Sequence, residues 1–174
     1  MKSISSGGGP LVCIEIDAVD RWHGIAGSEA FLKGGLERAN DYQRACSIRD
    51  YLGQVPLGDR TALVLGDMPL ETSIWQRSGD LPKIVRVYYG DPGVDIHALL
   101  EAAGELDFDD PVEAMSVEFS ASPVVIFDSA YSGADESIDQ ICFEILKGKY
   151  VALTKQFELD ERTSVLVHFF VKAQ

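Results

Sequence analysis

The chain has 174 residues, and its 28 Asp and Glu against 15 Lys and Arg give a formal net charge of −13. This length predicts a single domain over residues 1–174, large enough to fold without a metal or a disulfide. Ordinary hydrophobic and charged fractions, 46% and 25%, exclude a mainly disordered chain. The acidity argues against nucleic-acid and anionic-membrane binding, because both depend on Lys and Arg, and it favours a basic partner.

The cysteines and the N-terminal residues bear on the compartment. Cys13, Cys46 and Cys142 are widely spaced in apolar or helical stretches, which predicts reduced core residues. Residues 1–10 are rich in Gly, lack the apolar segment of a signal peptide, and are expected to form a flexible lead. No apolar run approaches the roughly 20 residues of a membrane span. We therefore expect a cytoplasmic protein.

The first part of the chain predicts one strand and one helix. Residues 11–16 form a short apolar run, which is typical of a buried strand. A loop or helical turn is expected at residues 22–24. Residues 40–53 predict a helix, since Asn40 or Asp41 is a good N-cap and a glycine stands at position 53.

The middle of the chain predicts strands and a second helix. Branched and aromatic residues predict a three-stranded meander over residues 61–65, 71–75 and 83–89. Asp91 offers an N-cap before Pro92, and apolar residues then recur at helical spacing up to Gly104. A helix is therefore expected between the meander and the C-terminal strands.

The C-terminal part predicts five strands, at residues 116–120, 123–128, 141–146, 149–159 and 163–172. Turn residues at 147–148 and 160–162 indicate two hairpins. Both faces of the last strand are apolar, which indicates a central strand. The order of elements predicts an α+β fold with a largely antiparallel sheet and about two helices packed on one side of it.

Acidic residues are concentrated in one segment. No Lys or Arg occurs between Arg86 and Lys147, and the 60 intervening residues hold 14 of the 28 acidic residues. Such a segment produces a strong negative field unless basic residues from elsewhere fold over it. The alternative is a solvated surface that only keeps the protein soluble.

The densest part of this segment follows the second predicted helix. The candidate partner-binding residues are Asp107, Asp109, Asp110 and Glu113 from this part, with Asp128, Asp135 and Glu136 from the rest of the segment. The spacing lacks the mid-loop glycine of a calcium-binding EF-hand, so no metal site is predicted. An exposed loop containing proline does not supply the pocket that acid/base catalysis by paired carboxylates needs.

Other motifs give weaker signals. The glycines at 7–9 precede the first strand and lack a Gly-Lys-Ser/Thr ending, so they do not predict a phosphate loop. The three histidines are isolated, which predicts neither a metal site nor a cofactor. The candidate interface anchors, each of which also suits a core position, are Trp22, Trp75, Tyr88, Tyr89 and Tyr131.

Four segments together resemble a known family. They are ISSGGGPL at 4–11, DYQRAC at 41–46, ALVLGDMPL at 62–70, and the C-terminal stretch from GKY at 148–150 to TSVLVH at 163–168. This set is similar to the immunity protein 21 family of bacterial polymorphic toxin systems, over nearly the whole chain. The resemblance implies a cytoplasmic antidote that binds and blocks a delivered toxin. It transfers no catalytic or binding residue.

The leading hypothesis is a non-enzymatic inhibitor whose acidic surface meets a basic face of a cognate protein toxin. The substrate cleft of a nuclease is an example of such a face, because it must be cationic to hold phosphates. One alternative is a small enzyme with Asp128, Tyr131 and His168 brought together at the strand ends. Another is a binding module for a small molecule, which would need a deep apolar pocket with a few convergent polar groups.

Overall fold

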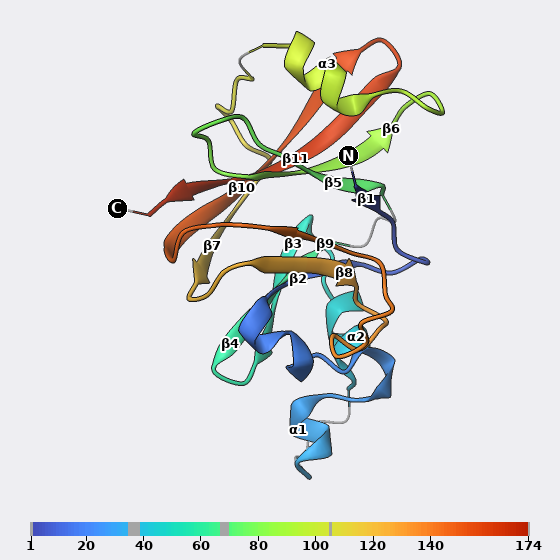
Figure 1. Ribbon diagram of the computed structural model, residues 1–174, viewed down its shortest axis with the longest axis vertical. Coiled ribbons are helices and arrows are strands. Elements are labelled where there is room, and N and C mark those ends of the chain that lie inside the picture. The colour runs from blue at the N-terminus through green and yellow to red at the C-terminus, as the bar shows by residue number, and fades with distance from the viewer. Residues whose placement is uncertain (1, 35–38, 67–69, 105, 174) are drawn as a thin grey trace.

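The computed structural model describes residues 2–34, 39–66, 70–104 and 106–173. Its strands form two antiparallel sheets that pack face to face, with short helices on the outside (Figure 1). The predicted α+β class with largely antiparallel pairing is therefore confirmed. The prediction of one sheet is wrong, because the strands divide between two.

The larger sheet has six strands in the order β1-β5-β6-β11-β10-β7. Their bounds are β1 Ser3–Ile4, β5 Thr72–Trp75, β6 Lys83–Tyr89, β7 Glu113–Phe119, β10 Gly148–Asp160 and β11 Thr163–Lys172. The last strand, β11, lies between β10 and β6, as its two apolar faces predict. The turn predicted at residues 160–162 joins β10 to β11.

The smaller sheet has five strands in the order β3-β4-β2-β8-β9. Their bounds are β2 Leu11–Glu15, β3 Leu52–Leu57, β4 Arg60–Leu65, β8 Val124–Asp128 and β9 Gln140–Phe143. The helical elements are η1 Ile16–Arg21, η2 Gly24–Ala26, α1 Glu29–Leu32, α2 Asp41–Cys46 and α3 Ile96–Ala102, of which η1 and η2 are 3-10 helices.

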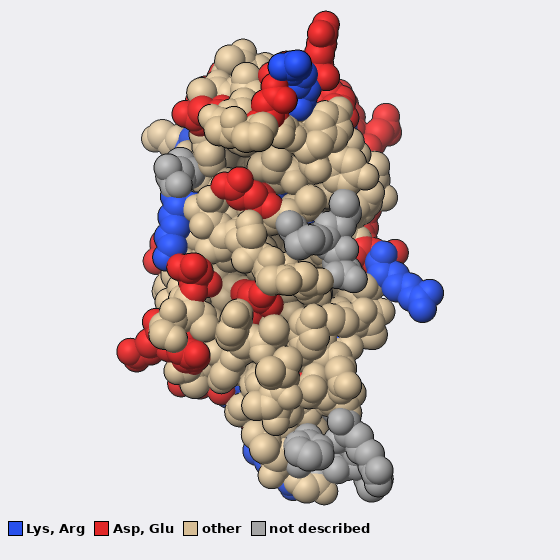
Figure 2. All heavy atoms as spheres, turned by 90° about the vertical axis from the view of Figure 1, so that its right-hand side faces the viewer, with Lys and Arg blue, Asp and Glu red and all other residues tan. Residues whose placement is uncertain are grey.

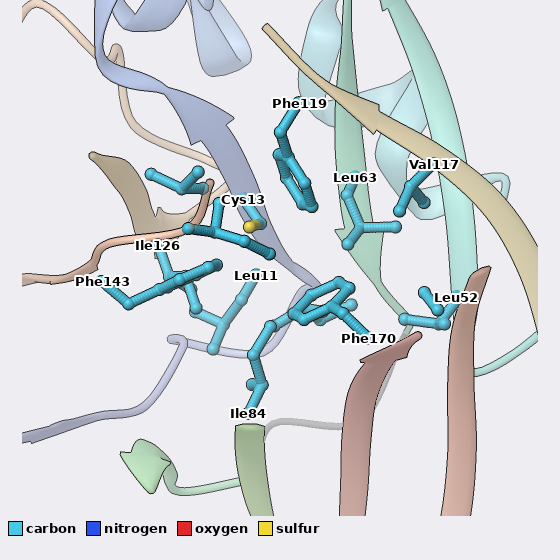
Figure 3. Packing of buried hydrophobic residues seen from close by; sticks show 14 of the residues in the cluster. Leu11, Cys13, Leu52, Leu63, Ile84, Val117, Phe119, Ile126, Phe143 and Phe170 are labelled. Carbon is cyan, nitrogen blue, oxygen red and sulfur yellow. The ribbon is translucent and has the colours of Figure 1, made fainter. Parts of the chain in front are cut away.

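The main core lies between the two sheets (Figure 3). Its aromatic centre is Phe170 of β11, whose ring centroid lies 5.4 Å from that of Phe119 and 6.2 Å from that of Phe143. Leu11 and Ile126 extend this cluster from the smaller sheet. Alternating apolar residues on the inner faces of both sheets produce this packing.

Helices cover part of the outer face of each sheet. On the smaller sheet, Ala18 of η1 and Ala45 of α2 pack with β-strand residues, so η1 and α2 cover this face. On the larger sheet, Leu100 of α3 packs against Val165 and Val167. The helices therefore lie on opposite outer faces, and the expectation that they share one side is wrong.

The helix predicted at residues 40–53 is shorter in the structure. Asn40 caps α2 with a capping box formed with Gln43, but the helix ends at Cys46. Position 53 lies inside β3, so this glycine is not a C-cap, and the sequence analysis missed this strand. Gly53 leaves room for Ile48, whose side chain would lie within 2.6 Å of an added Cβ.

Two predicted connections are also wrong. Strands β4, β5 and β6 do not form a meander, because β4 pairs in the smaller sheet and β5 and β6 pair in the larger one. The turn at residues 147–148 joins β9 to β10 across the two sheets, so it is not a hairpin. Both errors follow from partners that are distant in sequence.

The second helix begins later than predicted. Asp95, not Asp91, caps α3 by accepting a hydrogen bond from the backbone N–H of Ala98 at 3.1 Å. Gly104 follows the helix in the left-handed region with a φ of 72°, as its predicted role as a helix stop requires.

The N-terminal lead and the cysteines depart from expectation. Within the lead, Ser3 and Ile4 form β1 and pair with β5, so this part is not a flexible entry. All three cysteines are free thiols, but only Cys13 is buried, and Cys142 is exposed. The core prediction is therefore wrong for Cys142.

Candidate functional site

The two sheets differ in length, and this difference leaves part of one face uncovered. Strand β10 has 13 residues, whereas the longest strands of the smaller sheet have six. At about 3.3 Å per residue, β10 spans roughly 43 Å and those strands about 20 Å. The β10–β11 hairpin therefore extends past the smaller sheet toward α3 (Figure 1).

The burial pattern along β10 locates where the cover ends. On the inner face, Ala152 and Thr154 are buried, but Gln156 and Glu158 are exposed. On the outer face, Phe157 is still half-buried against the α3 side. The inner-face side chains of β10 are therefore exposed from residue 156 onward, whereas Ser164 and Leu166 of the neighbouring strand β11 stay buried beneath them.

A hydrogen-bonded network occupies this open face. The Tyr89 hydroxyl donates to Glu158 Oε2, and Ser164 Oγ donates to Glu158 Oε1 at 2.9 Å. Gln156 Nε2 donates to the same Oε1 at 3.0 Å and to Ser164 Oγ at 2.9 Å. Bonds from Tyr89 and Ser164 lower the pKa of Glu158, so this carboxylate stays ionised at neutral pH.

The surroundings of this network are strongly acidic. We define the acidic end as residues 88–95, 106–113 and 155–163, which together carry nine acidic and two basic side chains. Contacts join the three segments, since Arg162 Nη1 lies 2.8 Å from Asp91 and the Phe108 and Phe157 ring centroids are 5.3 Å apart. Figure 2 shows acidic side chains gathered around a basic one at the upper end, with others scattered singly below.

Basic residues neutralise the acidic segment only in part. Arg162 pairs with Asp91, and Lys155 Nζ lies 3.9 Å from Asp107. Arg77 lies 3.3 Å from Glu101 of α3. Two of these cations belong to the acidic end, yet seven net negative charges remain there by the sequence count.

Four predicted partner-binding residues lie together in the acidic end. Asp107, Asp109 and Asp110 are exposed, and Asp107 Oδ1 accepts the backbone N–H of Asp109 at 2.8 Å. Glu113 is half-buried beside β10, where its Oε2 accepts the hydroxyl of Thr154 at 3.5 Å, and burial raises its pKa. The first three carboxylates therefore face solvent, whereas Glu113 also serves the packing of β7.

The other three predicted residues lie on the smaller sheet. Asp128 is only 9% exposed, and its carboxylate accepts backbone N–H groups from Gly7 at 2.8 Å and Ala130 at 2.9 Å. Asp128 is therefore a structural residue, not part of an open surface. Asp135 and Glu136 are exposed on the β8–β9 loop, which lies beside α2, away from the acidic end (Figure 1).

The residues of the enzyme alternative are not brought together. His168 is completely buried in β11, and its Nδ1 lies 2.8 Å from Thr154 Oγ1. Asp128 is bonded to backbone groups at the end of β8, and Tyr131 is 52% exposed on the following loop. Burial lowers the pKa of His168 well below its ordinary value, with the charge of Arg86 adding to the effect.

A groove lies elsewhere, between strands β3 and β4 of one sheet and β7 and β10 of the other. This groove has a volume of about 410 Å³, and its lining includes Glu15, Arg60, Glu118 and Lys149. With Asp59, five charged residues line this groove, which makes it unlike the deep apolar pocket that a small-molecule module would need.

The described part of the chain holds neither a metal cluster nor a membrane-spanning helix. There, no group of three or more His, Cys, Asp or Glu side chains is arranged to hold a metal ion. No helix in the same residues is long and apolar enough to cross a membrane.

Comparison with protein families decides what this chain is. The family model described as immunity protein 21 matches residues 2–163. The chain belongs to the immunity protein 21 family. It is thus an immunity protein of toxin systems, and its partner is a cognate toxin. No curated protein and no solved structure matches it.

The sequence analysis of this immunity protein missed the network around Glu158. The inner face of β10 carries, in chain order, Tyr150, Ala152, Thr154, Gln156 and Glu158. This change from apolar to polar residues with period two is the signal of a strand that leaves its cover. It becomes readable once β10 is known to be a single strand of 13 residues.

Proposed function

We propose that this immunity protein neutralises its toxin in the cytoplasm by placing the acidic end on a basic face of the toxin. The observation that carries the proposal is the excess of nine acidic over two basic side chains in the acidic end, whose three segments contact one another. The family of this chain supplies the toxin as the partner. Complementary fields accelerate encounter and select which surfaces meet. The chain acts by covering its partner and performs no chemistry of its own.

A nuclease fits this proposal best among toxin classes. A nuclease must hold phosphates in a cationic cleft, so a dense carboxylate surface can occupy that cleft in place of nucleic acid. The partner residues proposed are Asp107, Asp109 and Asp110, with Glu113 supporting them from the start of β7.

The test uses matched triple variants and the toxin domain encoded by the neighbouring gene. One variant combines Asp107→Asn, Asp109→Asn and Asp110→Asn in the acidic end. The control combines Asp135→Asn, Glu136→Gln and Asp139→Asn on the β8–β9 loop. Both remove three charges, and both keep an acceptor oxygen for a local turn, at Asp107 in one and at Asp135 in the other.

We expect wild type to rescue cells that express the toxin. The acidic-end variant should lower the association rate constant about 10-fold at low ionic strength and flatten its salt dependence. The control should change that rate constant less than about twofold. Equal rate constants for wild type and both variants would show that the acidic end does not guide docking.

A further inference from the structure

We infer that a tyrosine platform formed by Tyr88, Tyr89 and Glu158 receives an arginine side chain from the toxin's basic face. This inference rests on the proposed function and names the contact that anchors the complex. The platform lies where β6, β10 and β11 extend past the smaller sheet. The smaller sheet therefore does not cover the side chains of the platform.

Two neighbouring tyrosines of β6 remain exposed to solvent. Tyr88 is 40% exposed and Tyr89 is 46% exposed, and their ring centroids lie 6.1 Å apart. Large aromatic residues that stay exposed are typical anchors of interfaces. By contrast, Trp22 and Trp75, which the sequence also offered as anchors, are 0% and 3% exposed and belong to the core.

Hydrogen bonds fix the platform before any partner binds. The Tyr89 hydroxyl donates to Glu158, and Ser164, which is completely buried, holds the other oxygen of that carboxylate. Side chains fixed in advance lose less conformational entropy on association, so more of the contact energy appears as affinity.

The carboxylate of Glu158 favours a guanidinium as the occupant of the platform. Glu158 remains ionised, and no Lys or Arg of the described residues is an ion-pair partner for it. An ionised carboxylate accepts about four hydrogen bonds, and three are made here, which leaves a position on Oε2. A guanidinium stacks on tyrosine faces and donates to a carboxylate at the same time, which an ammonium does less well.

The surrounding charge selects the same occupant. Asp160 and Glu161 follow Glu158 in the β10–β11 turn, and the nearest cation of that turn, Arg162, is paired with Asp91. A cationic side chain from the toxin would therefore enter a field with little local compensation. The partner chemistry that fits is a basic protein segment with an arginine at its centre.

The experiment measures binding of the full-length immunity protein to the purified toxin domain encoded by the neighbouring gene. Tyr89→Ala is expected to raise the dissociation constant about 30-fold, the scale of a hot-spot residue. Tyr89→Phe keeps the ring and should cost about threefold or less. Glu158→Gln should slow association severalfold at low salt.

The matched control is the pair Tyr131→Ala and Glu136→Gln on the β8–β9 loop, where both side chains are also exposed. Each should bind within about twofold of wild type. Thermal unfolding of every variant identifies those that are folded. Amide hydrogen exchange of wild type adds a test without substitution, and the toxin should protect residues 156–164.

The outcomes separate the platform from the proposed function. Weak binding by Tyr89→Ala with normal binding by the controls supports the platform. If wild type protects cells but folded Tyr89→Ala and Glu158→Gln variants bind normally, or residues 156–164 stay unprotected, the platform is wrong and the proposed function stands. If wild type neither binds nor protects, the proposed function fails, and the platform fails with it.

Discussion

The two ends of the sandwich differ in their balance of acidic and basic side chains. Residues 11–60, which include β2, β3 and the helical cover of the smaller sheet, contain eight acidic and six basic side chains. Many of these are paired locally, as in Arg60 with Asp17 at 2.8 Å and Arg44 with Asp41 at 3.1 Å. The acidic end has nine acidic and two basic side chains, so it holds about half of the net charge of −13.

This comparison shows that the net charge is unevenly distributed, since the acidic end holds about half of it. Exposed ion pairs contribute little stability, so pairing does not explain why the smaller sheet folds. Pairing does reduce the long-range field, but at the acidic end only two basic side chains face nine acidic ones, which leaves a negative field that a basic partner can sense. The stability of both ends depends instead on the shared core and on buried polar contacts.

The largest expected effect breaks the core that both sheets share. Phe170→Ala removes a 4% exposed ring from the contact with Phe119 and Phe143. We expect a loss of about 3–5 kcal/mol in the free energy of unfolding, because a cavity forms between the sheets. Urea unfolding measures the loss. Val171→Ala, at a 47% exposed neighbour, should cost less than about 0.5 kcal/mol, and equal losses would contradict the packing described.

A smaller effect is expected at the buried carboxylate that fixes one sheet to the other. Glu15 of β2 accepts the backbone N–H groups of Ser120 and Ala121, which follow β7, and lies 3.3 Å from Arg60. Glu15→Ala leaves these donors without their acceptor, so we expect a loss of about 2 kcal/mol.

The measurement for Glu15 is again urea unfolding, with Glu118→Ala as the control. Glu118 is an exposed acid of β7 that also borders the groove between the sheets. Its removal should change the free energy of unfolding by less than about 0.5 kcal/mol. Similar values for the two variants would show that the carboxylate of Glu15 does not join the sheets.

The smallest effect concerns pH and the interior of the larger sheet. Burial keeps His168 neutral in the folded chain, whereas in the unfolded chain it titrates near 6.5. Below that pH the unfolded state binds a proton that the folded state does not, so stability falls as pH falls. One pH unit below 6.5, the loss from this residue approaches about 1.4 kcal/mol.

The test compares unfolding free energies at pH 7.5 and pH 5.5 (about one unit either side of the ordinary histidine value). His168→Gln should lose about 1.4 kcal/mol less than wild type over this interval. His97→Gln is the control, because burial also lowers the pKa of His97, but this side chain is only partly buried. The same pH dependence in wild type and His168→Gln would refute a neutral buried histidine.

Sequence alone predicted local structure well where the signal is local. The strand at Leu11–Glu15, the central position of Thr163–Lys172 and the helix stop at Gly104 all follow from side-chain periodicity or turn chemistry. The helix over 40–53 was overextended, because its cap at Asn40 is local but its end depends on β3 pairing with β4.

The candidate site was only partly readable from the sequence. The acidic segment and the tyrosines at 88 and 89 were visible as composition, but Glu158 and Ser164 were not singled out. In the sequence, Asp128 was one of the acidic residues predicted to bind the partner. Only the fold showed that its carboxylate accepts hydrogen bonds from the backbone N–H groups of Gly7 and Ala130.

The sequence by itself determined the amount of charge, the family and the alternation of each strand, because these depend on residue identity and short-range spacing. The tertiary structure alone decided which strands share a sheet and where the smaller sheet stops covering β10. Long-range pairing and burial depend on residues far apart in the chain, so no local pattern encodes which carboxylates remain in water.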